Sequence, residues 1–210
     1  DALIKLRIRY GSQESLYLAK SLWGKVRNIA ADESAALGHE RGVYPACMGA
    51  YRRNATLTCI APTGTISLIA GVSSGIEPVF SFRHTRMAFA GTQALEYVHP
   101  LYEQAQREGW YDPDVFVSAH EISVPEQIAM QAAFQESTDL AVSKTINLPN
   151  SATVEDVREA YLLAWKQCCK GITVYRDGCL DSQVLIADGS KAKAQDKPTK
   201  RGLPYRREEG

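Results

Sequence analysis

The chain has 210 residues, of which 45% are hydrophobic, enough to bury one substantial core or a large piece of a bigger one. Its 24 basic residues balance its 24 acidic residues, so no overall charge draws it towards DNA or an anionic membrane. No apolar run reaches the roughly 18 residues of a membrane span, and residues 1–10 do not resemble a secretion signal. We therefore expect a cytoplasmic protein with no membrane partner and no direct DNA binding.

The first predicted element is an amphipathic helix. From Ser12 to Ala36 the apolar residues recur at three- and four-residue steps, and Ser12 and Ser15 are suitable N-caps. Residues 41–54 mix Gly, Pro, Tyr and Arg, which indicates a loop. Residues 55–60 alternate small or apolar side chains with β-branched ones, a pattern typical of a short buried strand.

A tight turn and a second loop follow this predicted strand. Residues 62–67 read Pro-Thr-Gly-Thr-Ile-Ser and lead directly into the apolar residues 68–70, so a strand, a turn and a helix start are adjacent. Residues 71–78 read Gly-Val-Ser-Ser-Gly-Ile-Glu-Pro, with glycines where a positive φ is needed and a proline at the end. We expect this second segment to be a flexible loop.

The second half of the chain predicts alternating helices and strands. Helical spacing covers residues 90–107, where Pro100 is expected to kink or split the helix, and residues 125–134. Residues 141–148 and 171–175 are typical of strands, and the helix between them is expected over residues 154–169. Thr153 is its predicted cap, with Asp156 three positions on. A strand, a crossover helix and a strand of these lengths predict a right-handed βαβ unit with parallel strands, hence an α/β fold.

The turn at residues 62–67 has the parts of a phosphate cradle. The start of a helix offers backbone N–H groups and the positive end of the helix dipole, while Thr and Ser hydroxyls donate without adding charge. Gly64 lacks the Cβ that would keep an oxygen away from the backbone. Such turns also cap helices with nothing bound, so the residues alone leave both interpretations open.

Three separate runs carry a resemblance to a known family. They are residues 54–67 (Asn-Ala-Thr-Leu-Thr-Cys-Ile-Ala-Pro-Thr-Gly-Thr-Ile-Ser), residues 71–78 and residues 170–178 (Lys-Gly-Ile-Thr-Val-Tyr-Arg-Asp-Gly). In this order they closely resemble the catalytic barrel of the large subunit of ribonucleotide reductases. The resemblance covers about residues 1–186 and implies the C-terminal part of a ten-stranded α/β barrel. It leaves residues 187–210 as a flexible basic tail leading towards a further module.

The resemblance also implies roles for individual residues. In that family the turn holds the phosphates of the substrate, and the loop that follows shapes the active site. The residues matching the phosphate turn are Thr63, Gly64, Thr65, Ile66 and Ser67, and those matching the active-site loop are Ser74, Gly75, Glu77 and Pro78. We assign Glu77 no catalytic proton transfer; a carboxylate that fixes the loop is at least as good an interpretation.

Two differences from the family pattern indicate which class of ribonucleotide reductase the chain resembles and which part of its chemistry the chain lacks. Iron-dependent members carry two adjacent tyrosines on the last barrel strand, whereas Tyr175 is followed here by Arg176, which cannot relay a radical. Together with the Thr-Gly-Thr-Ile-Ser form of the turn, this resembles the class that uses adenosylcobalamin as its cofactor. The radical-bearing cysteine of the family lies in an Asn-x-Cys-x-Glu pattern, which these 210 residues do not contain.

The five cysteines form no C-x-x-C pair, which argues against a structural zinc site or a disulfide framework. We expect reduced and mostly buried thiols, with Cys59 in the core and Cys179 as the most accessible. We assign no metal ligand and no catalytic residue to the chain.

The resemblance implies a fragment of a vitamin B12-dependent ribonucleoside-diphosphate reductase, inactive by itself, that supplies substrate positioning. Its expected partners are the ribonucleotide substrate, the N-terminal half of the same barrel and a thiol reductant such as thioredoxin. The alternative is a non-catalytic nucleotide-binding or complementing subunit of a split reductase. Half a barrel leaves parallel strand edges unpaired, so we expect the isolated chain to be poorly soluble or to need its missing half.

Overall fold

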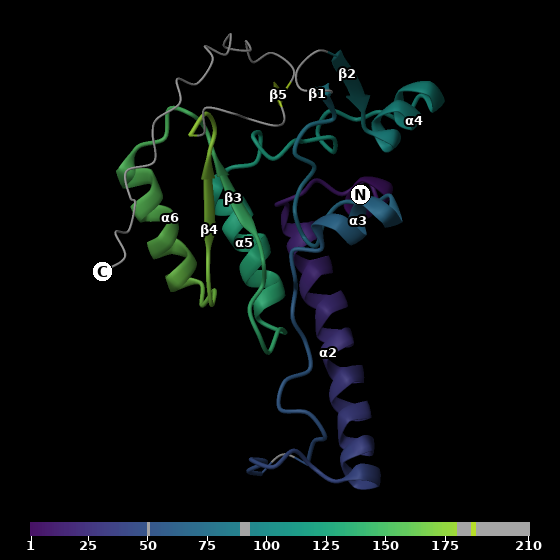
Figure 1. The fold of residues 1–210 in the computed structure, drawn as a ribbon, viewed down its shortest axis with the longest axis vertical. Coiled ribbons are helices and arrows are strands. Elements are labelled where there is room, and N and C mark those ends of the chain that lie inside the picture. The colour runs from purple at the N-terminus through teal and green to yellow at the C-terminus, as the bar shows by residue number, and fades with distance from the viewer. Residues whose placement is uncertain (50, 89–92, 180–185, 188–210) are drawn as a thin grey trace, which may run out of the picture.

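A computed structural model describes residues 1–49, 51–88, 93–179 and 186–187 (Figure 1). Along the chain the helices and strands are α1 (Ala2–Lys5), α2 (Gln13–Arg41), α3 (Gly64–Ala70), β1 (Arg83–Ala88), β2 (Gln93–Val98), α4 (Pro100–Glu108), α5 (Val124–Gln135), β3 (Thr145–Leu148), α6 (Val154–Lys166), β4 (Thr173–Arg176) and β5 (Ile186–Ala187). None of the helices in these ranges is long and apolar enough to cross a membrane. The predicted tail was residues 187–210; Ala187 is the last residue of β5, and residues 188–210 lie outside the described residues.

The C-terminal half is a parallel strand pair with helices packed against it (Figure 1). β3 and β4 pair in parallel, with Thr145 opposite Thr173, and α6 connects them. A core cluster joins α5, β3 and α6, and its fully buried members are Ile128, Ile146, Ala160 and Ala164. The prediction of a strand–helix–strand unit with parallel strands, and hence of the α/β class, is confirmed.

Capping boxes fix where the two helices of this half begin. The Thr153 hydroxyl accepts from the backbone N–H of Asp156 at 3.3 Å, and the Asp156 carboxylate accepts from the N–H of Thr153 at 2.6 Å. Ser123 and Glu126 form the equivalent box at the start of α5. The prediction that Thr153 caps α6 is therefore confirmed, because both ends of the box are hydrogen-bonded.

The long helix α2 packs against α5 of the C-terminal half. It begins after Ser12, whose side chain accepts from the N–H of Ser15 as predicted, and it ends at Arg41, beyond the predicted end at residue 36. Near its start Ala19 packs with Met130 and Ala133 of α5. Near its far end Ser34 accepts from the N–H of Arg53 at 2.8 Å, which fixes the start of the segment that returns towards α3.

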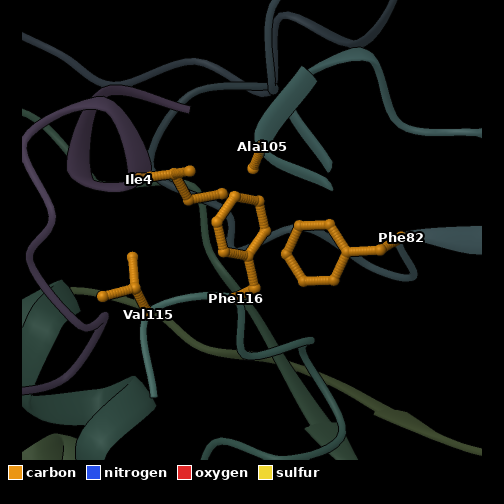
Figure 2. Close-up of a cluster of buried hydrophobic side chains, with 5 residues drawn as sticks. All are labelled: Ile4, Phe82, Ala105, Val115 and Phe116. Carbon is orange, nitrogen blue, oxygen red and sulfur yellow. The ribbon is translucent and has the colours of Figure 1, made fainter. Parts of the chain in front are cut away.

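A hydrophobic cluster packs around Phe82, which follows the loop of residues 71–78. Its buried members are Ile4, Phe82, Ala105, Val115 and Phe116, and Figure 2 shows the rings of Phe82 and Phe116 lying close together. The two ring centroids are 5.3 Å apart. Since Phe82 follows soon after residue 78, this cluster anchors the C-terminal end of that loop.

The predicted helix over residues 90–107 was wrong in its first part. Residues 93–98 form β2, which pairs antiparallel with β1, and α4 begins only at Pro100. Proline at the first position of a helix needs no N–H acceptor and forces the preceding residue out of the helical region. Pro100 therefore starts a helix here and does not kink one. Residues 89–92 lie outside the described residues.

The other predicted elements differ mainly in length. The predicted strand at residues 55–60 is an extended segment with a single parallel bridge, from Ile60 to Val142. The strand predicted over residues 141–148 is a regular strand only from Thr145 onward. The helix predicted to residue 169 ends at Lys166, because Cys168 adopts a left-handed conformation with φ 59°.

Candidate functional site

The predicted phosphate turn lies at the N-terminus of α3. Thr63 is the N-cap residue and has a left-handed conformation (φ 52°, ψ 24°), and its carbonyl accepts from the N–H of Ser67 at 2.9 Å. The N–H groups of Gly64, Thr65 and Ile66 precede this first helical hydrogen bond, so the helix itself gives them no acceptor. The turn therefore presents three consecutive amides at the positive end of a short helix.

These three residues are exposed, and the space above Gly64 is open. A Cβ built on Gly64 meets no atom within 4 Å. Gly64, Thr65 and Ile66 are exposed, whereas Ser67 is only 5% exposed. The three amides and the Thr65 hydroxyl are therefore accessible to an anion from solvent, but the Ser67 hydroxyl is not.

The loop of residues 73–78, predicted to shape the active site, is hydrogen-bonded to this turn. The N–H of Gly75 donates to the Thr63 hydroxyl at 2.9 Å, and the hydroxyls of Ser67 and Ser74 lie 2.8 Å apart. Gly75 has φ 48°, and a Cβ there would lie 3.3 Å from the carbonyl oxygen of Ala61. The turn and the loop thus form one unit, and a glycine at position 75 allows their close approach.

Glu77 attaches the loop to β3. One of its carboxylate oxygens accepts from the N–H of Thr145 at 2.6 Å, and the other pairs with the ammonium of Lys144 at 2.8 Å. The Lys144 side chain is completely buried, and burial lowers its pKa even though the Glu77 carboxylate acts in the opposite direction. The structure therefore gives Glu77 the contacts of a carboxylate that fixes the loop.

Lys144 was not predicted as a site residue, although its place in the pattern of apolar residues marks it as unusual. The alternate residues Val142, Lys144, Ile146 and Leu148 are all buried, so Lys144 lies on the inward face of a strand-like segment. A lysine in phase with three apolar residues on one face is rare and calls for a partner. The partner itself, Glu77, lies 67 positions earlier and cannot be found from this pattern.

Tyr10 holds the loop from the other side. Its hydroxyl donates to the carbonyl of Ile76 at 2.8 Å. Burial raises the pKa of Tyr10 well above its usual value of 10.0, and the nearby Glu77 carboxylate raises it further. Tyr10 therefore stays protonated at physiological pH and remains a hydrogen-bond donor to the loop.

The expectation of mostly buried cysteines was wrong. Cys59, Cys168 and Cys179 are exposed, and Cys47 and Cys169 are intermediate. Cys59 is not a core residue: its extended segment alternates, so Thr58 and Ile60 point inward and Cys59 points outward. Cys179 is accessible as expected, and partial burial raises the pKa of the Cys169 thiol, with a smaller contribution from Cys168.

Arg176, which follows Tyr175 on β4, is hydrogen-bonded to the segment that precedes α6. Its guanidinium donates to the carbonyls of Asn150 and Ala152, each at 3.5 Å. Tyr175 is half-buried and lies opposite Asn147 in the parallel pair. No group of three or more His, Cys, Asp or Glu side chains able to hold a metal ion occurs among the described residues.

Helix α3 exposes an apolar surface. Ile66 is 63% exposed, Leu68 81%, and Ile69 82%. Nonpolar side chains gathered on a short helix in this way are typical of a surface that packs against another part of a protein. Within the described residues nothing covers this surface.

Comparison with known proteins agrees with the resemblance seen in the sequence. Residues 48–175 match the family model for the ribonucleotide reductase barrel domain. A vitamin B12-dependent ribonucleoside-diphosphate reductase of Thermoplasma acidophilum is 41% identical over 92% of this chain and 29% of its own length. One from Mycobacterium tuberculosis is 40% identical over 91% of this chain and 32% of its own length. The chain thus spans about a third of the length of these relatives.

A solved structure supports the same fold. The alpha subunit of the Actinobacillus ureae class Id ribonucleotide reductase matches with a TM-score of 0.70 and 22% identity, over 84% of this chain and 37% of that subunit. At this level of identity the match supports the fold, while the family model and the sequence relatives establish the family. The chain therefore belongs to the family of ribonucleotide reductase barrel domains.

Proposed function

We propose that this chain is the part of an adenosylcobalamin-dependent ribonucleoside-diphosphate reductase that holds the phosphates of the substrate. The observation that carries the proposal is the turn at the start of α3, where the amides of residues 64–66 are exposed and have no acceptor within the helix. Aligned amides at the positive end of a helix bind anionic oxygens. The turn is also hydrogen-bonded to the loop of residues 73–78, so the amides are held in place before a ligand arrives.

In this proposal the turn binds a diphosphate by backbone contacts. The exposed hydroxyl of Thr65 adds a further donor, and the open space above Gly64 gives an oxygen direct access to the backbone. Ser67 acts indirectly, because it is buried against Ser74. The choice of a diphosphate follows the names of the relatives from Thermoplasma acidophilum and Mycobacterium tuberculosis.

The same names support adenosylcobalamin as the radical initiator of the complete enzyme. We place the radical-bearing cysteine in the remaining part of the protein, because the 210 residues contain no Asn-x-Cys-x-Glu pattern. This chain then contributes no step of radical chemistry, but it fixes the position of the substrate during that chemistry.

The main partner in this proposal is the N-terminal part of the same barrel. The exposed apolar surface of α3 and the edge of β4 that is unpaired within the described ranges are the places where the barrel would continue. The other proposed partner is a dithiol reductant of the thioredoxin kind, acting on the complete cytoplasmic enzyme.

The second candidate is a non-catalytic nucleotide-binding or complementing subunit of a split reductase. Like the first candidate, it accounts for the absence of an Asn-x-Cys-x-Glu pattern from the 210 residues. A separately encoded N-terminal portion that carries this pattern and binds the chain would distinguish a complementing subunit from a segment of one continuous enzyme.

Reduction of ribonucleoside diphosphates with adenosylcobalamin and a dithiol tests the proposal directly. The chain is assayed alone and mixed with a separately produced N-terminal part that carries the radical cysteine. We expect activity only in the mixture. Activity of the chain alone would contradict the assignment of the radical cysteine to the missing part, and inactivity of a mixture shown to associate would favour the non-catalytic subunit.

A glycine substitution then tests the turn itself. A Cβ at position 64 meets no protein atom within 4 Å, so we expect Gly64→Val to retain the fold while it blocks the approach of a phosphate. We expect the affinity for the diphosphate to fall about 10- to 100-fold, because the loss of a hydrogen bond to a charged group costs about 1.5–3 kcal/mol. Gly171→Val is the matched control, since a Cβ there also meets nothing within 4 Å. Equal diphosphate affinities of the two variants would refute the role of the turn.

A further inference from the structure

Lys144 is an unusual core residue, and its surroundings explain how it is tolerated. Its side chain has 0% exposure, and the ammonium has three acceptors: a Glu77 oxygen at 2.8 Å, the Gln127 side-chain oxygen at 3.4 Å and the carbonyl of Thr145. Three acceptors match the three protons of an ammonium group. The buried charge is therefore fully hydrogen-bonded.

A second lysine, Lys20, shows that a lysine can pair with a glutamate without being buried. Lys20 pairs with Glu136 at the same N–O distance, 2.8 Å, but the two side chains are 54% and 62% exposed. A surface pair contributes little to stability, and a buried pair is often no more stabilising than apolar residues of similar volume. Burial of Lys144 on an otherwise apolar strand face therefore favours a role in geometry.

A short series of contacts leads from Lys144 to the phosphate turn. Lys144 and the N–H of Thr145 hold both oxygens of Glu77. Two and three residues before Glu77, Gly75 and Ser74 make the hydrogen bonds to the turn. The carboxylate thus fixes the loop to β3 within three residues of the atoms that fix the turn.

We propose that Lys144 is a positioning residue for the phosphate turn, acting through Glu77 and the loop of residues 73–78. The inference rests on the proposed function of the turn. Lys144 touches no substrate: it sets where Gly75 and Ser74 meet Thr63 and Ser67, and thereby where the three exposed amides point. Preorganised donors of this kind lose their value when they move by a fraction of an ångström.

Hydrogen exchange tests the mechanical part of this proposal without any ligand. Exchange is followed at hydrogen-bonded amides of the two segments, those of Ser67, Gly75 and Glu77. It is measured by mass spectrometry on the full chain, co-expressed with the N-terminal part of the barrel where it does not stay soluble alone. In Lys144→Met we expect exchange in both segments to rise about tenfold or more, since local opening becomes easier when a buried contact is lost. Lys20→Met is the matched control and leaves both segments unchanged.

Steady-state kinetics of the assembled reductase test the consequence for the substrate. Lys144→Met is expected to raise the KM for the diphosphate about 10- to 100-fold, whereas kcat at saturating substrate changes much less. A purely structural role would lower the folded fraction, which reduces the apparent kcat and leaves KM unchanged. Glu77→Gln keeps an acceptor for the N–H of Thr145 but removes the negative charge that pairs with Lys144. It replaces Lys144→Met if that variant does not fold, and we expect it to raise KM by a smaller factor.

The outcomes separate this inference from the proposed function. Unchanged exchange in residues 63–67 and 73–78, in Lys144→Met or in Glu77→Gln, would overturn the positioning role. An unchanged KM with a lowered kcat would overturn it as well. Absence of diphosphate binding by the unsubstituted assembly would reject the proposed function, while the exchange result would still decide whether Lys144 orders the turn.

Discussion

The unit formed by α5, β3, α6 and β4 and the segment of residues 61–78 are stabilised in different ways. In the unit, Ile128, Ile146, Ala160 and Ala164 are at most 3% exposed and bury a shared core. In the segment, the apolar side chains of α3 are exposed, and the contacts that order it include hydrogen bonds to Asp1, Tyr10, Lys144 and Thr145.

This difference indicates which part can stand alone. A unit that buries its own apolar surface gains stability from every contact inside it. A segment held by a few polar contacts is ordered by its neighbours, and its exposed apolar side chains gain nothing until another surface covers them. The same property suits a ligand-binding turn, since its amides remain accessible.

The sharpest test of the comparison is a pair of isoleucine truncations. Ile128→Ala removes a side chain with 0% exposure and is expected to lower the free energy of unfolding by about 2–5 kcal/mol. Ile69→Ala, at 82% exposure, is expected to change it by less than about 0.5 kcal/mol. Denaturant unfolding of the full chain measures both, and similar losses would show that α3 is buried in solution. In the assembled reductase we expect Ile69→Ala to weaken association.

A buried glutamine tests the polar contacts within the same unit. The side-chain amide of Gln131 on α5 donates to the carbonyls of Gly171 at 2.7 Å and Val142 at 3.3 Å. Gln131→Leu leaves both carbonyls without this donor and is expected to cost about 1–3 kcal/mol of unfolding free energy. Gln106→Leu, at an exposed position on α4, is the control and is expected to be nearly neutral. A neutral Gln131→Leu would mean that packing alone holds α5 on the strands.

A substitution in the loop addresses the hydrogen-bonded segment. Gly75→Ala places a Cβ at a residue with φ 48° and 3.3 Å from the carbonyl oxygen of Ala61, so a cost of about 1–2 kcal/mol is expected. Gly64→Ala meets no neighbour and is expected to be neutral or slightly stabilising. Thermal unfolding compares the two; equal midpoints would show that the loop adjusts without strain.

The smallest expected effect is on the stability of the fold at low pH. The N–H and hydroxyl of Thr153 donate to the Asp156 carboxylate and lower its pKa below the usual 3.8. A depressed pKa in the folded state means that this contribution to stability is present above pH 3.8 and is lost as the pH falls through the folded-state pKa. The midpoint of thermal unfolding is therefore expected to fall more steeply below pH 4 for the unsubstituted chain than for Asp156→Asn. Parallel curves for the two proteins would exclude a contribution from this box.

Much of the C-terminal half could be predicted, because its signals are local. The Thr153 and Asp156 pair sets the start of α6, the apolar spacing identifies α5 and α6, and the helix between two strands requires them to be parallel. In the candidate site, the motif of residues 62–67 located the turn before α3. The loop of residues 71–78 was also recognised, although its contacts were not.

The errors occur where pairing partners decide the structure. Residues 93–98 have helical spacing but form β2, because β1 offers a strand to pair with. Cys59 was expected in the core, but only one face of its extended segment is covered. Short apolar stretches suit both helices and strands, and tertiary contacts select between them.

By itself the sequence determined the family motifs, the helix starts and the alternation that places residues 142, 144, 146 and 148 on one face. These depend on the backbone period and on side chains three or four positions apart. Only the tertiary structure decided that Lys144 meets Glu77, that Tyr10 holds the loop and that Ser67 is buried against Ser74. Contacts between Glu77 and Lys144, or between Tyr10 and Ile76, join residues more than sixty positions apart, and such pairings depend on how the whole chain packs.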